Sequence, residues 1–332
     1  MRSLILFALV GVGAQLVDGA LGMAFGVTAS TLLVLSGVAA AQASAAVHLA
    51  EVGTTFASGL SHWRFKNIDW SIVAKLGVPG AIGAFLGATV LSSLSTEDAA
   101  PLMAGILLCI GAYVLVRFSL GRPPGLRNTH TSHTAKFLAP LGLFGGFIDA
   151  SGGGGWGPVT TSTLLSQGKT APRTVIGSVS ASEFLVAVSA SLGFVIGLRE
   201  EFLNNLPIVA GLAIGGMIAA PLAAWLVTKV SPALLGTAVG GVIVLSNSQK
   251  LLKYFGITGG WSVAVYATIV VVWLGLLAYA VRASRAPQFV PEELEAVESE
   301  AEVEDLASAP GAEADAEASV EPVEQVVGKT GR

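Results

Sequence analysis

Four acidic residues lie inside or at the edges of otherwise apolar stretches: Asp18, Glu51, Asp149 and Glu183. A carboxylate at the centre of a membrane helix costs roughly 2.5–3.5 kcal/mol, so such groups face one another or a water-filled cavity. Burial favours the protonated form of a carboxyl group, which makes these residues candidates for carrying protons. We predict a proton-coupling role for all four, together with His48, which shares a helix face with Glu51.

Other roles are open for three of these residues. Asp18 and Asp149 stand just before glycine-rich segments, where they could equally cap the backbone N–H groups of a following helix. His48 could equally be a structural histidine whose hydrogen bonds are satisfied. Glu51 and Glu183 lie deep in their helices, where proton coupling or cavity polarity explains them better than capping.

The second chemical signal is the segment Asp149–Pro158, in which five glycines and a proline fall within seven positions. Glycine costs about 1 kcal/mol and proline about 3 kcal/mol relative to alanine in a helix, so the helix must break here. A break at membrane depth must face protein or a water-filled cavity. A helix that restarts there presents unpaired N–H groups and about half a positive charge, which suits a small anion.

We therefore predict that the glycine-rich segments and the hydroxyl-bearing residues after them bind substrate. The predicted substrate-binding residues are Gly22, Gly26, Thr28, Ser151, Gly152, Gly153, Gly154, Gly155, Trp156, Gly157, Thr160 and Thr161. Close packing of helices through small residues is the alternative explanation for such glycines. Lysine and arginine are missing from the deep parts of the apolar stretches, which leaves a cation substrate open as well.

The composition identifies the class of protein. The chain has 332 residues, of which 53% are hydrophobic and only 12% charged, against roughly a quarter charged in soluble domains. Apolar runs of about 17–25 residues recur, long enough to cross a ~30 Å hydrocarbon core. The first run, residues 1–17, is interpreted as a retained membrane segment and not a signal peptide. The only cysteine, Cys109, excludes an intrachain disulfide.

No nucleophile–base pair, metal-ligand cluster or nucleotide loop is recognisable in the sequence. We therefore expect no enzyme activity, no metal, no cofactor and no nucleic-acid partner. The expected partners are a small anionic substrate, protons as coupling ion and the lipid bilayer, with a homo-oligomer left open. The expected location is the cell membrane, as a multi-pass protein.

An internal repeat organises the chain. Asp18–Gly26 matches Asp149–Gly157 at an offset of 131 residues, and after one further residue the offset becomes 132. At that offset Glu51 meets Glu183. In each half, a glycine-rich break between two short apolar runs is followed by three spans. They are expected at about 40–61, 70–94 and 99–119 in the first half, and at about 172–197, 205–228 and 232–252 in the second. Paired breaks in repeated halves are typical of secondary transporters.

The runs beside each break are too short to cross a membrane alone, so they form either one interrupted span or a re-entrant hairpin. With hairpins the halves are inverted in topology, and eleven basic residues fall on one side against four on the other. By the positive-inside rule the side with eleven is cytoplasmic. With an interrupted first span, ten basic residues fall on one side against five on the other, and the C-terminus is placed on the opposite side of the membrane. The hairpin gives the larger difference, so we prefer it.

The resulting fold class is an all-α polytopic membrane protein with two repeat halves and one extra C-terminal span. The predicted segments are a first repeat at 1–119, a polar loop at 120–135, a second repeat at 136–254, an extra span at 261–281 and a tail at 286–332. The tail holds 13 of the 22 acids and two bases. We expect it to be disordered and cytoplasmic, either as a solvated tail or as a docking site for a partner.

The doubled glycine motif, with the hydroxyl-rich run after each copy, resembles the sulfite exporter TauE/SafE family of membrane transporters. The resemblance covers about residues 4–255. It rests chiefly on Gly-Gly-Gly-Gly-Trp-Gly-Pro at 152–158, whereas the first copy has Leu21 in place of a glycine and Val27 in place of the proline. It implies transport of small sulfur-containing anions such as sulfite or organosulfonates, with proton-coupled export. A carboxylate transporter, and a passive channel or membrane scaffold, are the alternatives.

Overall fold

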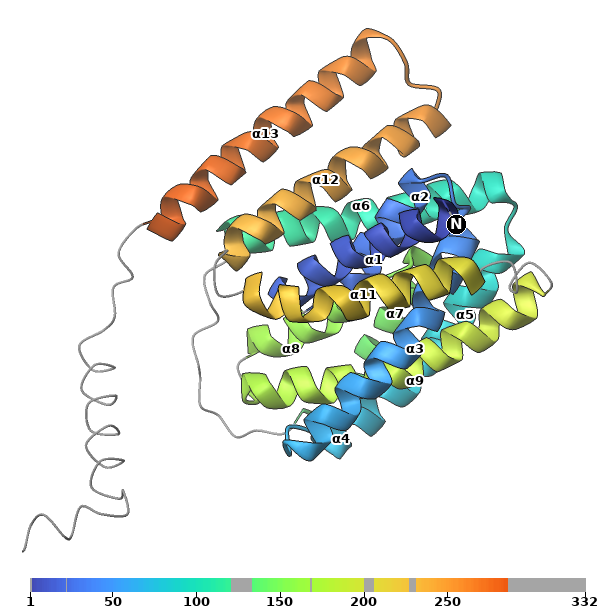
Figure 1. The fold of residues 1–332 in the computed structure, drawn as a ribbon, viewed down its shortest axis with the longest axis vertical. Coiled ribbons are helices and arrows are strands. Elements are labelled where there is room, and N and C mark those ends of the chain that lie inside the picture. Colours follow the sequence, from blue (N-terminus) through green and yellow to red (C-terminus); the bar gives the residue numbers. More distant parts are fainter. Residues whose placement is uncertain are drawn as a thin grey trace, which may run out of the picture. The chain divides into compact units, whose positions relative to one another are not determined.

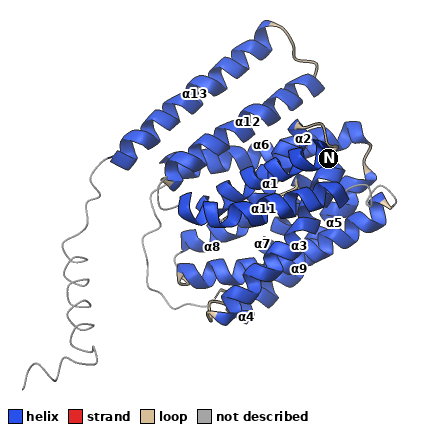
Figure 2. Cartoon of the chain, viewed as in Figure 1, coloured by secondary structure: helices blue, strands red, loops and turns tan. Residues whose placement is uncertain are grey.

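The computed structural model describes residues 2–21, 23–120, 133–167, 169–199, 206–226 and 231–285. Most of the predicted polar loop, the whole acidic tail and Gly22 lie outside these residues. Every regular element in the described part is a helix (Figure 2). Met1–Ser284 packs as one unit, which agrees with a helical membrane protein.

The long helices lie close to the predicted spans (Figure 1). They are α3 (Ala40–Arg64), the continuous run α4 (Trp70–Ile72), η1 (Val73–Gly77) and α5 (Val78–Ser93), then α6 (Thr96–Leu120), α9 (Pro172–Leu198), α11 (Leu206–Leu226), α12 (Pro232–Tyr254) and α13 (Gly260–Arg285). Among the residues that the structure describes, four segments are long and apolar enough to cross a membrane: Trp70–Ser93, Thr96–Leu120, Pro172–Leu198 and Gly260–Ala283. The prediction of an all-α polytopic membrane protein is confirmed.

The shorter elements form two hairpins around the glycine-rich segments. The first consists of α1 (Arg2–Leu21) and α2 (Phe25–Leu35), and the second of α7 (Ala135–Gly152), η2 (Gly157–Thr161) and α8 (Ser162–Gln167). The breaks are narrower than predicted, because the helices continue past both aspartates. In the second hairpin α7 ends at Gly152, and the next residue, Gly153, adopts a left-handed φ of 72°. Glycine takes this conformation without a Cβ penalty and so ends the helix.

The helix directions follow from close contacts between backbones. We call the end of the unit near Arg64 and Lys66 the basic end. Helix α9 starts there, because a Cβ on Gly177 would meet the carbonyl oxygen of Asn67. At the opposite end, a cavity wall joins the start of α3 to the end of α9 and to the turn between α5 and α6. Helices α3 and α6 therefore run toward the basic end, whereas α5 and α9 run away from it.

Each hairpin leaves by the end at which it enters. Helix α7 runs parallel to α5, with Gly142 against Leu76 and Gly87 against Phe147, so it starts at the basic end. Helix α11 begins eight residues after α9 ends, so it starts at the opposite end. Helix α1 runs parallel to α11, with Gly211 against Phe7 and Gly216 near Gln15, so it also starts at that end. These paths favour re-entrant hairpins over interrupted crossings. The inverted repeat itself stays a prediction.

Candidate functional site

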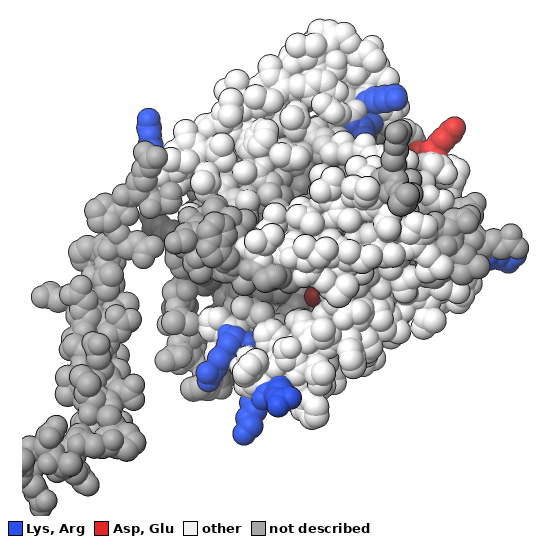
Figure 3. Space-filling view, viewed as in Figure 1, with Lys and Arg blue, Asp and Glu red and all other residues white. Residues whose placement is uncertain are grey.

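A cavity of about 340 Å³ lies where the two hairpin tips meet the crossing of α3 and α9. Figure 3 shows a small acidic spot recessed between uncharged residues near the middle of the face, with the lysine and arginine side chains toward its edges. Ten predicted site residues line the cavity: Asp18, Gly26, Glu51, Asp149, Gly154, Gly155, Trp156, Gly157, Thr161 and Glu183. The structure thus brings together residues that lie up to 165 positions apart in the sequence.

Six other predicted residues are described by the structure but do not line the cavity: Thr28, His48, Ser151, Gly152, Gly153 and Thr160. His48 lies behind Asp149 and contacts it directly. The hydroxyls of Ser151 and Thr160 donate to carbonyl oxygens of their own helices, so they are not free to bind a ligand. Gly153 packs against Ser30 and Met103. These positions support the site from behind.

A hydroxyl-bearing face of α3 was missed by the sequence reasoning. Thr54, Thr55, Ser58 and His62 line the cavity with Glu51, at spacings of 3, 4, 7 and 11 residues along one helix. Such spacing places side chains on a single face. The pattern was visible in the sequence, but small and hydroxyl residues also occur where helices simply pack together.

The two hairpin tips are in direct backbone contact. A Cβ built on Gly154, whose φ is 147°, would overlap the backbone at Gly26 and Val27. A Cβ on Gly26 would lie 2.9 Å from the Gly154 Cα and 2.9 Å from the Glu51 Oε1. Ser30 donates a hydrogen bond across this contact to the Gly153 carbonyl. Glycine is therefore required here for close approach of one chain segment to another, more than for flexibility.

Both aspartates cap the helix that follows their break. Asp18 Oδ1 accepts hydrogen bonds from the N–H groups of Ala24 (2.8 Å) and Phe25 (3.0 Å). Asp149 Oδ1 accepts from the Trp156 N–H at 2.8 Å. Capping satisfies donors that a helix start would otherwise leave unpaired. The same contacts remove those N–H groups from the set available to a substrate anion, which corrects part of the anion-binding argument made from the sequence.

A buried ion pair distinguishes the second aspartate from the first. His48 Nε2 lies 3.0 Å from Asp149 Oδ2, and both side chains are almost fully buried. His48 Nδ1 lies 2.8 Å from the Ser44 carbonyl oxygen. A carbonyl oxygen only accepts, so Nδ1 carries a proton, and the contact between Nε2 and Oδ2 then requires a second proton. The two side chains thus fix each other's position behind the cavity.

Within the described residues, Asp18 of the first hairpin has no basic partner of this kind. At the repeat offset of 132, Ser180 stands where His48 stands in the first half. Ser180 instead shares a hydrogen bond of 2.8 Å with Ser58 across the α3–α9 contact. The two halves of the site are thus chemically unequal.

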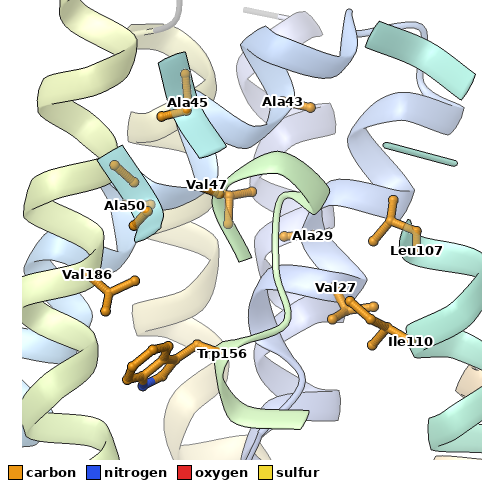
Figure 4. Close-up of a cluster of buried hydrophobic side chains, with 14 of the residues drawn as sticks. Val27, Ala29, Ala43, Ala45, Val47, Ala50, Leu107, Ile110, Trp156 and Val186 are labelled. Carbon is orange, nitrogen blue, oxygen red and sulfur yellow. The ribbon is translucent and has the colours of Figure 1, made fainter. Parts of the chain in front are cut away.

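Trp156 fixes the second tip against the long helices. Its side chain is fully buried, and Nε1 donates to the Val179 carbonyl at 3.2 Å. Figure 4 shows the indole ring extending from the tip toward Val186. Gly80 of α5 leaves the space that the ring occupies, because a Cβ there would come within 2.5 Å of it. The glycine-rich tip therefore has a rigid anchor at its end.

The cavity occupies only the half of the α3–α9 crossing that faces the basic end. There the walls carry Thr54, Thr55, Ser58 and His62. The repeat-related positions in the other half are Val186, Ala187, Ala190 and Phe194, and all four are at most 1% exposed. Phe194 packs against the His48 ring, with centroids 6.0 Å apart. One half of the crossing is hollow and polar, and its counterpart is filled and largely apolar.

The contact between the tips yields a stability prediction. Replacing Ser30 by alanine leaves the buried Gly153 carbonyl without the Ser30 hydroxyl, which costs about 1–3 kcal/mol. We expect a lower thermal unfolding midpoint in detergent. Ser93→Ala is the control, because its exposed hydroxyl only donates to Val90 within the same helix. Equal midpoints for the two variants would contradict the proposed role of Ser30.

Comparison with known proteins identifies the class to which this architecture belongs. Residues 7–249 match the family described as Sulfite exporter TauE/SafE. The chain belongs to the TauE/SafE family. The matched range contains both hairpins and the α3–α9 crossing. The prediction of a membrane transporter rather than an enzyme is confirmed.

Two relatives of the TauE/SafE chain come from Bacillus subtilis (strain 168). The chain is 48% identical over 279 residues to the "Probable membrane transporter protein YtnM", covering 84% of this chain and 93% of that protein. It is 24% identical over 195 residues to the "Probable membrane transporter protein YdhB", covering 58% of this chain and 79% of that protein. No solved structure matches it. Among the described residues of this TauE/SafE protein, no group of three His, Cys, Asp or Glu side chains could hold a metal ion.

Proposed function

We propose that this protein is a proton-coupled transporter of small sulfur-containing oxyanions, sulfite or an organosulfonate, and that the cavity between the hairpin tips binds the transported ion. The observation that carries the proposal is the meeting of both glycine tips with Glu51 and Glu183 in one cavity. Secondary transporters bind substrate near the midplane between their repeats, at broken helices.

The proposed oxyanion binding depends on hydrogen-bond donors at the helix starts that are not bound by the capping aspartates. The first N–H groups of a helix have no partner inside the helix. Asp18 and Asp149 take those of Ala24, Phe25 and Trp156. The N–H groups of Gly26 and Gly157 and the Thr161 hydroxyl belong to cavity-lining residues. They form a small donor set, which fits a compact oxyanion.

A flux screen in proteoliposomes tests this function. Sulfite, sulfoacetate, thiosulfate and small carboxylates would be offered under an imposed pH gradient. We expect saturable, uncoupler-sensitive accumulation of at least one sulfur oxyanion. Transport of carboxylates alone would show that the proposed sulfur-oxyanion substrate is wrong. Passive, non-saturating flux would indicate a channel and not a transporter.

A further inference from the structure

Glu51 and Glu183 are the acidic groups of the cavity that no cap or ion pair occupies. They are repeat-related residues on α3 and α9, and both line the cavity. Glu51 is only 5% exposed and Glu183 is partly buried, and within the described part of the chain no hydrogen bond joins either carboxyl group to another residue. A nearly buried carboxyl group without a partner, directed into a cavity, indicates that a ligand or a proton completes its surroundings.

The other charges facing these two glutamates are mostly negative. Helix α1 contributes Asp18 and α7 contributes Asp149, which is paired with His48 of α3. Helices α2 and α11 and the segment η2 contribute no ionisable side chain in their described residues. The remaining group that can become positive is His62 at the end of α3, eleven residues or about 16 Å along the helix from Glu51. No lysine or arginine occurs among the lining residues that the structure describes.

We propose that the transported anion and protons on Glu51 and Glu183 occupy the cavity together, so that the protein is a proton–anion symporter. This inference rests on the proposed function and adds the sign of its coupling, which under an acidic exterior gives uptake and not the export that the family resemblance implies. An anion entering beside ionised glutamates would meet only like charges at that wall. Protonation removes this repulsion.

Hydrogen bonding favours the same sign. An ionised carboxylate only accepts hydrogen bonds, whereas a protonated carboxyl group also donates one. Protonated Glu51 and Glu183 would add two O–H donors to the small donor set at the helix starts. An antiporter would need the anion and the protons to exclude each other, and nothing on this cavity wall gains from their separation.

The sign of the response to a pH gradient tests the proposal with the full-length wild-type chain. Sulfoacetate is a suitable probe, because its carboxylate and its sulfonate stay ionised between about pH 6 and 8, so the substrate itself carries no proton. We expect an acidic exterior to drive accumulation inside proteoliposomes, accompanied by a rise in external pH. Accumulation driven by an acidic interior would overturn symport while leaving anion transport intact. If none of the screened anions moves in any gradient, the proposed function itself fails.

The pH dependence of the KM assigns the protons to residues. In a symporter the external KM for sulfoacetate rises about tenfold for each unit of increase in pH and for each proton that binds with the anion. We expect this dependence to be lost in the double variant Glu51→Gln with Glu183→Gln, and halved on a logarithmic scale in either single variant. Glu97→Gln, an exposed glutamate of α6, is the control with an unchanged profile. An unchanged profile in the double variant would overturn the assignment, and if that variant is inactive the single variants decide.

Discussion

Replacing Gly154 by valine is expected to abolish transport. The residue has a φ of 147°, a conformation that side chains rarely adopt, and its missing Cβ is the space into which the backbone of Gly26 and Val27 fits. A side chain there would force the two hairpin tips apart. Because the cavity wall is made from both tips, its shape would be lost together with the contact.

Backbone strain and steric overlap are separated by a second glycine. Gly37 also has a positive φ, 91°, but a Cβ there would meet nothing within 4 Å. Gly37→Ala should therefore cost about 1 kcal/mol through strain alone and leave flux intact. Gly154→Ala, which carries both penalties, should already reduce flux strongly. Wild-type flux through Gly154→Val, measured on protein of confirmed monodispersity, would show that the tips do not shape the site.

The second large effect is expected at the buried pair of His48 and Asp149. Asp149→Ala removes both the ion-pair partner of His48 and the cap of the Trp156 N–H. Breaking a buried pair from one side costs about 3–5 kcal/mol, because the remaining partner is left uncompensated. We expect a large fall in the free energy of unfolding, measured by denaturation in detergent.

The repeat supplies matched controls for this prediction. Asp18→Ala removes the equivalent cap without an ion pair, so it should cost only about 0.5–2 kcal/mol. Asp149→Asn keeps an oxygen for the Trp156 N–H and a donor for a neutral His48, so it should retain most of the stability. If Asp18→Ala and Asp149→Ala were equally destabilising, the pair with His48 would have no energetic role.

The spans and the repeat could be predicted because they depend on local pattern. Apolar length predicted the continuous run from α4 to α5, and helices α6 and α9, to within a few residues. The offset of 132 pairs Glu51 with Glu183 from the sequence alone. The ends of the breaks were harder. A helix end depends on which single glycine adopts a left-handed φ, and in a run of four consecutive glycines the sequence offers several equivalent choices.

The contacts between distant segments were not predictable from pattern. His48 and Asp149 are 101 residues apart, and their pairing depends on how the second tip packs against α3. The sequence left capping and transport open for the aspartates, and the structure contains both caps. Local spacing indicates which side chains share a helix face, but not which helix lies opposite that face.

The unequal filling of the α3–α9 crossing has a consequence for the proposed transport cycle, in which the site would open alternately to the two ends of the helix bundle. The polar cavity lies on one side of the glutamates, whereas the buried side chains of Phe194, Ala190 and Val186 fill the other side. Opening the filled half of the crossing would expose this apolar surface, and the free energy required grows with the apolar area that is uncovered. In such a cycle the differences between Ser58 and Ala190, and between His62 and Phe194, would favour the conformation that is open toward the basic end.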